Sequence, residues 1–171
     1  MEEQECIFCK IVQKKIPAKI VYEDENFLAF LDIRPLNPGN ALVVPKQHHR
    51  WVYDVPNFGE YWEVAKKVAI SAIKGLNAIS VSFATLGFEI SHAHIRVIPR
   101  FENDGHDSFI NWNAVKEIPE QEMDEIAKKM RENIPAEVKE EIAHEEPVEE
   151  KVEEKLTEED AEWIRKELER V

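Results

Sequence analysis

The sequence predicts an α+β fold in which a small antiparallel sheet accompanies two amphipathic helices. In the first 45 residues, short β-branched and apolar runs alternate with tight turns, which is typical of an antiparallel meander. Helical periodicity then appears at residues 57–76 and again at residues 119–133. With 171 residues, the chain is long enough for one domain and an extension.

Turn-forming residues separate the expected strands. Glu-Asp-Glu-Asn at 23–26, Arg34-Pro35 and Asn37-Pro38-Gly39 each interrupt an apolar run, and Gly87 ends another. The runs between them are rich in Val, Ile and Phe, which are favoured in sheets. The strands expected on this basis are residues 20–22, 27–33, 41–44, 81–86 and 90–98.

The two expected helices each carry a single apolar stripe. Side chains three and four positions apart share one face of a helix, and such a face normally packs against a core. We expect the second helix, within residues 119–134, to pack on a domain formed by residues 1–118. The stripes consist of Tyr61, Val64, Ala65, Val68, Ala72 and Leu76 in the first helix, and of Met123, Ile126, Ala127 and Met130 in the second.

Residues 135–171 form an acidic, low-complexity extension. They hold 15 acidic and 6 basic side chains, so most of the formal net charge of −13 lies there. A segment this polar cannot bury enough apolar surface to fold alone, so we expect a tether that ends in a helix. Thr157 suits the N-cap, with Asp160 near the capping-box position. One side of that helix would carry Ala161, Ile164, Leu168 and Val171. Such a helix either docks on a protein or stays solvated.

The charge distribution and the hydropathy narrow the classes of partner. Outside the extension the net charge is only −4, which allows a locally positive pocket for one nucleotide, whereas duplex nucleic acid and anionic membranes are disfavoured. No apolar run reaches the ~20 residues of a membrane span, and the acidic N-terminus lacks the apolar stretch of a secretion signal. We therefore expect a soluble, cytoplasmic protein.

The stretch SHAHIRVIPR, residues 91–100, carries the strongest chemical signal. On a strand, alternate side chains share a face, so His92, His94 and Arg96 would lie together. Histidines on strands are usually structural, but two of them followed by an arginine would all need polar partners, and this favours a functional cluster. A neutral imidazole can attack phosphorus, and a guanidinium can hold phosphate oxygens, so phosphate chemistry suits the row.

The two cysteines, Cys6 and Cys9, suit a metal better than a disulfide staple. Together with His92 and either His48 or His49 they would give a Cys₂His₂ set, the donor set of a closed structural zinc site. A redox pair and two reduced thiols near the surface remain alternatives.

Asp32 has two interpretations. Alternation places it on one face with Leu28 and Phe30, where its carboxylate would accept hydrogen bonds from a ribose diol while the apolar neighbours pack a base. Taken alone, however, an aspartate at the end of a strand more often caps the following turn, here before Pro35.

Two long blocks strongly resemble the histidine triad (HIT) family of nucleotide-binding hydrolases and transferases. The blocks are CIFCKIVQKKIPAKIVYEDENFLAFLDIRPLNPGNALVVPKQH and GFEISHAHIRVIPRF, and the resemblance covers about residues 5–112 in order. It implies a HIT-like fold with an antiparallel sheet, a homodimer whose sheets join edge to edge, and one nucleotide pocket per subunit.

The resemblance also implies roles for particular residues. His94 matches the nucleophile that attacks the α-phosphate of a nucleotide conjugate and forms a nucleotidyl-histidine intermediate. In the zinc-bearing branch of the family, the ligands match Cys6, Cys9, His48 and His92. The positions that hold a purine nucleotide match Ile7, Phe8, Ile11, Phe30, Asp32 and Ile33.

Three departures from the family pattern shape the functional prediction. Arg96 replaces the third histidine, Phe88 replaces a glutamine, and the stretch SVSFATLGF lacks an asparagine. We expect Arg96 to act with His94 as a phosphate ligand in a nucleoside phosphate or phosphoramidate hydrolase, or a nucleotidyltransferase. The alternative is a catalytically weak nucleotide-binding or adaptor protein that uses its acidic tail to hold a partner.

Overall fold

The structure is a computed structural model that describes residues 6–106, 109–136, 162–163 and 165–166. By its internal contacts the chain divides into two compact units, Met1–Val138 and Lys139–Val171. The first unit carries every sheet strand in the described part of the chain.

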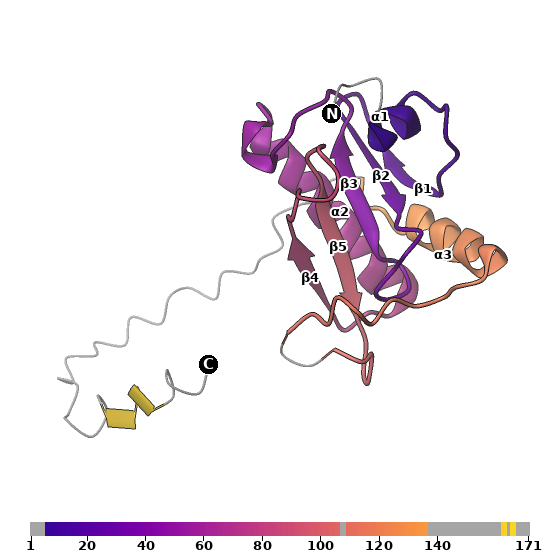
Figure 1. Ribbon diagram of the computed structural model, residues 1–171. Coiled ribbons are helices and arrows are strands. Elements are labelled where there is room, and N and C mark those ends of the chain that lie inside the picture. Colours follow the sequence, from indigo (N-terminus) through magenta and orange to yellow (C-terminus); the bar gives the residue numbers. More distant parts are fainter. Residues whose placement is uncertain (1–5, 107–108, 137–161, 164, 167–171) are drawn as a thin grey trace. The chain divides into compact units, whose positions relative to one another are not determined.

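A five-stranded antiparallel sheet forms the centre of the first unit (Figure 1). The strand order is β1-β2-β3-β5-β4, so the first three strands form the expected meander and β5 lies between β3 and β4. The strands β2 and β4 each end two residues earlier than expected. The strands are β1 Ile20–Glu23, β2 Phe27–Leu31, β3 Ala41–Pro45, β4 Ser80–Ala84 and β5 Ile95–Arg100.

Within the described residues of the first unit, four helical segments accompany the sheet. Helices α2 (Phe58–Leu76) and α3 (Glu120–Glu132) confirm the two amphipathic helices expected from the sequence. All four residues of the α3 stripe are buried. Two short segments, α1 (Ile7–Val12) and the 3₁₀ turn η2 (Val52–Asp54), were not expected. They are too short to display an apolar stripe of their own.

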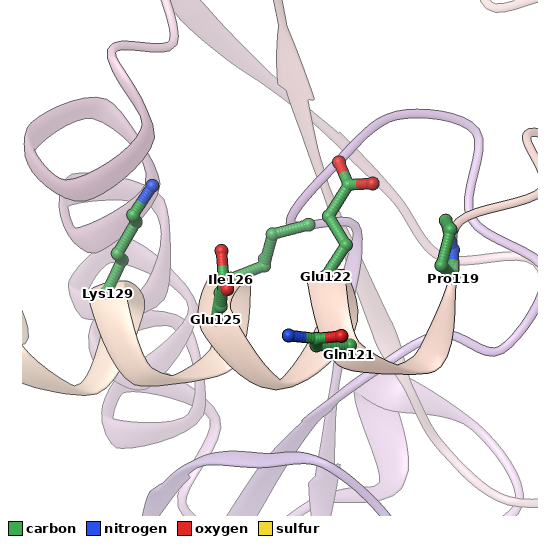
Figure 2. Close-up of a pocket in the computed structure, with 6 residues that line it drawn as sticks. All are labelled: Pro119, Gln121, Glu122, Glu125, Ile126 and Lys129. Carbon is green, nitrogen blue, oxygen red and sulfur yellow. The ribbon is translucent and has the colours of Figure 1, made fainter.

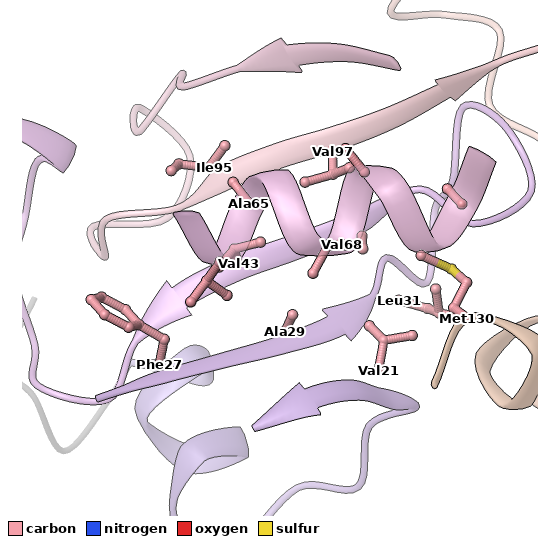
Figure 3. Close-up of a cluster of buried hydrophobic side chains, with 14 of the residues drawn as sticks. Val21, Phe27, Ala29, Leu31, Val43, Ala65, Val68, Ile95, Val97 and Met130 are labelled. Atoms are coloured by element: carbon pink, nitrogen blue, oxygen red, sulfur yellow. The ribbon is translucent and has the colours of Figure 1, made fainter. Parts of the chain in front are cut away.

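Apolar side chains on both faces of the sheet explain why β2 and β3 are buried throughout. One face packs against α2 and α3 and forms the larger core, part of which Figure 3 shows. There the Phe27 ring stacks on that of Tyr61 with centroids 5.1 Å apart, and the Tyr61 hydroxyl donates to the Val43 carbonyl at 2.7 Å. The opposite face packs against α1 through Leu28, Phe30, Leu42 and Val44. Both cores therefore share the alternating side chains of the same strands.

The segment before β5 differs from the expected strand. The prediction ran from residue 90 to 98, whereas β5 begins at Ile95. The neighbouring strand β3 ends at Pro45, which has no N–H with which to extend a ladder. Residues 90–94 instead form an irregular segment in which the Ala93 N–H donates to the His49 carbonyl at 2.7 Å.

The second unit is described at four residues only. These residues are helical and exposed, and Lys166 pairs with Glu162 at 3.2 Å. The expected N-cap Thr157, the neighbouring Asp160 and the apolar side with Ala161, Ile164, Leu168 and Val171 lie outside the described residues. Across the part of the chain that is described, no helix is long and apolar enough to cross a membrane.

Two glycines of α2 provide a test of the α2–α3 packing. A Cβ at Gly75 would lie 2.8 Å from the Lys129 carbonyl oxygen of α3, whereas a Cβ at Gly59 would meet nothing within 4 Å. We expect Gly75→Ala to lower the free energy of unfolding by about 1–3 kcal/mol, since it forces the helices apart. Gly59→Ala should leave it unchanged or raise it by up to about 1 kcal/mol. Urea unfolding of both variants measures the difference, and equal effects would contradict the packing.

Candidate functional site

The candidate site lies where α1, the end of β3 and the segment before β5 meet. Cys6 precedes α1 and Cys9 lies within it, so both thiols are held on one short helix. His48 follows β3, and His92 lies three residues before β5. The ligand atoms of these four side chains all lie within 4.8 Å of one another. The structure thus brings together the four expected metal ligands and selects His48 over His49.

The backbone fixes the tautomer of His92. Its Nε2–H donates to the Pro45 carbonyl at 2.9 Å, which leaves Nδ1 with the lone pair. Nδ1 lies 3.4 Å from the Cys6 sulfur and 3.5 Å from the Cys9 sulfur. Burial lowers the pKa of His92 to about 4, and the nearby His48 contributes to the decrease. His92 is therefore neutral at pH 7 and has its basic nitrogen among the thiols.

The donor set of this cluster fits zinc. Two thiols and two imidazoles are the ligands of closed tetrahedral zinc sites, and Cys9 also lies 3.2 Å from Nδ1 of His48. Ligating histidines commonly donate their second N–H to a carbonyl, as His92 does to Pro45. Both cysteines are buried and neither forms a disulfide.

His94 is held by the backbone of His92. Its Nδ1–H donates to the His92 carbonyl at 2.8 Å, which leaves Nε2 as the unprotonated nitrogen. The rings of Phe8 and His94 are nearly perpendicular, with centroids 5.5 Å apart. Burial is the largest cause of a lowered pKa of His94, and the Arg96 charge lowers that pKa further. The backbone hydrogen bond and the Asp32 charge oppose these effects. A neutral imidazole with a free nitrogen is a competent nucleophile.

Arg96 and Asp32 form an ion pair beside His94. Nη1 of Arg96 donates to Oδ2 of Asp32 at 2.5 Å. The other carboxylate oxygen, Oδ1, accepts the Arg34 N–H at 3.0 Å. Asp32 therefore caps the turn after β2, as one sequence interpretation expected, and its other oxygen is paired with Arg96, which neither interpretation expected.

Three of the expected nucleotide-binding residues pack together on the α1 face of the sheet. Phe8, Ile11 and Phe30 belong to one buried cluster, and the Phe8 and Phe30 rings meet edge to face at 5.5 Å. Ile7 is partly exposed beside them, whereas Ile33 is 87% exposed, clear of that cluster. The structure therefore provides an apolar wall next to His94 that includes Phe8, Ile11 and Phe30, and it does not bring Ile33 into that wall.

Two functional groups of the site escaped sequence analysis because they are backbone carbonyls. Pro45 orients His92, and the carbonyl of His92 orients His94. Main-chain acceptors leave no residue-type signal. The sequence contains Pro45 after an expected strand and two histidines two residues apart, but neither feature shows that the carbonyls of Pro45 and His92 orient the histidine rings.

A separate surface depression on α3 contributes nothing to this chemistry. It is lined by Pro119, Gln121, Glu122, Glu125, Ile126 and Lys129 (Figure 2). None of these residues is a histidine or a cysteine, and α3 packs on the sheet face opposite to that of α1.

Comparison with known proteins identifies the family of this chain. The HIT domain family matches residues 13–103, more than half of the chain, and the protein belongs to this family. An uncharacterised HIT-like protein of Methanocaldococcus jannaschii is 40% identical over 135 residues, which span 74% of this chain and 98% of that protein. The adenosine 5′-monophosphoramidase of Saccharomyces cerevisiae is 31% identical over 131 residues, which span 74% of this chain and 79% of the yeast protein.

A solved structure supports the assignment of fold and metal. The zinc-bound histidine triad family protein of Mycobacterium smegmatis matches with a TM-score of 0.65 and 30% sequence identity. The match covers 78% of this chain and 95% of the mycobacterial chain. The HIT-like α+β fold expected from the sequence is therefore confirmed, and the zinc in that neighbour agrees with the donor set found here.

Zinc content provides a direct test of the four-residue cluster. We expect the purified protein to hold about one zinc per chain, and Cys9→Ser to lose most of it because one thiolate ligand is removed. His49→Ala is the matched control, since His49 neighbours His48 but is not one of the four clustered side chains. Elemental analysis and thermal unfolding report the result. Full zinc occupancy in Cys9→Ser, or equal loss in both variants, would contradict the assignment.

Proposed function

We propose that this protein is a nucleotide-conjugate hydrolase or nucleotidyltransferase that uses His94 as its nucleophile. The observation that carries the proposal is the hydrogen bond from His94 Nδ1 to the His92 carbonyl, because it leaves Nε2 unprotonated. The similarity to a yeast adenosine 5′-monophosphoramidase supports a nucleoside phosphoramidate as the substrate class.

The proposed reaction has two displacements at the α-phosphorus. Nε2 of His94 attacks phosphorus, the bond to the leaving group breaks, and the leaving group takes up a proton from solvent. The nucleotidyl group is then bonded to His94. Water, or another acceptor in a transferase, attacks the same phosphorus, loses a proton to solvent, breaks the phosphorus–nitrogen bond and releases the nucleotide. Dividing one difficult displacement into two easier ones is the advantage of a covalent intermediate.

Arg96 is proposed to stabilise the charge on the phosphate. Its Nη1 is engaged by Asp32, whereas its Nε is buried and has no hydrogen-bond partner among the described residues. The Nε–Nη2 edge of a guanidinium matches two phosphate oxygens, and a preorganised cation stabilises the transition state more than the ground state. This residue would thereby replace the third histidine of the family pattern.

The apolar wall beside His94 is proposed to receive a purine nucleoside. Phe8 and Phe30 are buried beside His94 and would form the aromatic lining, and Asp32 follows Phe30 by two residues at the polar end of that face. Ile7, Ile11 and Ile33 would complete the pocket, with Ile33 closing on the base from its exposed position. Most nucleotide sites combine such apolar walls with a few placed polar groups.

Zinc is proposed to have a structural role. Cys6, Cys9, His48 and His92 would hold it, and the bound ion would supply rigid coordination and no chemistry. Since the carbonyl of His92 orients His94, fixing the His92 ring also steadies the nucleophile. Two buried reduced thiols agree with a cytoplasmic location, which we include in the proposal.

We also propose a homodimer formed along the β4 edge. β4 is the last strand of the sheet, and the exposed Phe83 and Ile79 lie on or beside it. An edge strand with exposed apolar side chains is a template for pairing with a second chain. Joining two such edges would extend the sheet across both subunits.

Loss of the nucleophile tests the proposed function. We expect His94→Ala to lower kcat for AMP release from adenosine 5′-phosphoramidate by at least about 10³-fold, because no other group replaces the attacking nitrogen. Intact-mass spectrometry of the wild type during turnover should show one nucleotidyl group per chain, which is absent in the variant. His49→Ala is the control and should retain activity. Undiminished turnover by His94→Ala would refute the proposal, and AMP binding without turnover in the wild type would favour the nucleotide-binding alternative.

The mass of the protein in solution tests the dimer. We expect light scattering to give twice the chain mass, and Phe83→Glu to give the single-chain mass because it places a charge at the paired edge. Ile33→Glu is the matched control, since Ile33 is also exposed but follows β2, three strands away from β4. A wild-type protein of single-chain mass would exclude the proposed assembly.

A further inference from the structure

We propose that Asp32 serves to position Arg96 and leaves the ribose hydroxyls weakly bound, so that the site accepts 2′-deoxyribonucleotides almost as well as ribonucleotides. This inference rests on the proposed function, because it concerns the sugar specificity of the same pocket.

Both oxygens of the Asp32 carboxylate already have protein partners. Oδ2 accepts Nη1 of Arg96 at 2.5 Å and Oδ1 accepts the Arg34 N–H at 3.0 Å. The Asp32 side chain is only 9% exposed and the Arg96 side chain only 18% exposed. Each oxygen keeps a second lone pair, but the carboxylate is largely buried and its charge is already paired with Arg96, so a ribose diol would gain less from it than from a free carboxylate.

The energetics favour the ion pair over the sugar. A charge-assisted hydrogen bond is stronger than a bond from a neutral hydroxyl. Removing the carboxylate from Arg96 would also leave a largely buried guanidinium without its counter-charge, which is more costly than leaving a sugar hydroxyl in water. The pair should thus persist when a nucleotide binds.

Strand register explains why an arginine reaches Asp32. Arg96 of β5 lies opposite Leu42 of β3, and Leu42 lies opposite Phe30 of β2. Asp32 comes two residues after Phe30, so it continues the same face of the sheet. The long arginine side chain crosses β3 to meet it. A histidine at position 96 has a shorter side chain that would not reach across β3, and would leave the carboxylate free for a ribose.

The pair also orients the part of Arg96 that remains available. Because Asp32 holds Nη1, the guanidinium cannot rotate freely, and its buried Nε has no partner in the described part of the chain. This geometry reserves the Nε–Nη2 edge for an anion. In this site Asp32 is therefore a positioning residue that acts on the phosphate through Arg96.

Comparison of AMP with dAMP tests the inference on the full chain. Calorimetric titration of the wild type should give dissociation constants within about 3-fold of each other. In Arg96→His the preference for AMP should rise to about 10-fold or more, because the freed carboxylate binds the ribose. Asp32→Asn should weaken the binding of both nucleotides by the same factor and leave the ratio of their dissociation constants unchanged.

Asp24→Asn is the matched control. Like Asp32, Asp24 caps a turn by accepting the N–H two residues later, here that of Asn26 at 2.8 Å, but it holds no arginine. It should change neither affinity. A wild-type preference for AMP above about 10-fold that disappears in Asp32→Asn would overturn the inference. An Arg96→His variant whose ratio of dAMP to AMP dissociation constants equals that of the wild type would also overturn the inference.

Failure of the inference is distinct from failure of the proposed function. If both nucleotides bind and turnover depends on His94, but the sugar preference is strong, only the inference fails. If neither nucleotide binds, the proposed function fails and the inference fails with it.

Discussion

The site depends on one residue, His92, whose side chain connects the sheet to the thiol cluster and whose main-chain carbonyl orients the nucleophile. Its Nε2–H is bonded to the Pro45 carbonyl at the end of β3, so its Nδ1 faces Cys6 and Cys9. Its own carbonyl accepts Nδ1–H of His94 and so leaves the opposite nitrogen of His94 unprotonated. Both bonds run through main-chain carbonyls, which the fold holds rigidly. The chemistry of two histidines is thus set by backbone geometry.

A second constraint is the covered sheet. Packing by α2 on one face and α1 on the other leaves the polar row of His92, His94 and Arg96 in largely buried surroundings, where every polar group needs a partner. The histidines meet this need with carbonyls and thiols, and Arg96 meets it in part, because Asp32 accepts from Nη1 while the buried Nε has no partner among the described residues. An arginine at position 96 therefore also engages the Asp32 carboxylate, and this pair is the basis of the proposed sugar specificity.

Sequence patterns predicted most of the fold because the main elements are long enough to repeat. The stripes of α2 and α3 span several turns, and the meander is bounded by strong turn residues. The helix α1 was missed, since its six residues show no period, although its cysteines were recognised as ligands. The strand predicted at 90–98 was too long. Residues 90–94 have no strand partner beyond Pro45, and this depends on tertiary structure that a local pattern does not reveal. Alternation still placed His94 and Arg96 together, but the ion pair with Asp32 depends on register across β3, which no local pattern reveals.

The most direct test of this account is the protonation pattern of the two histidines, read by long-range ¹H–¹⁵N correlation NMR at neutral pH. The account predicts that His92 carries its proton on Nε2 and His94 carries its proton on Nδ1, with Nε2 of His94 unprotonated. A His92→Ala variant should leave the tautomer of His94 unchanged, because alanine keeps the main-chain carbonyl that accepts from Nδ1 of His94. The opposite tautomer at His94, with Nε2 protonated in the wild type, would contradict the claim that the backbone prepares this nitrogen for attack.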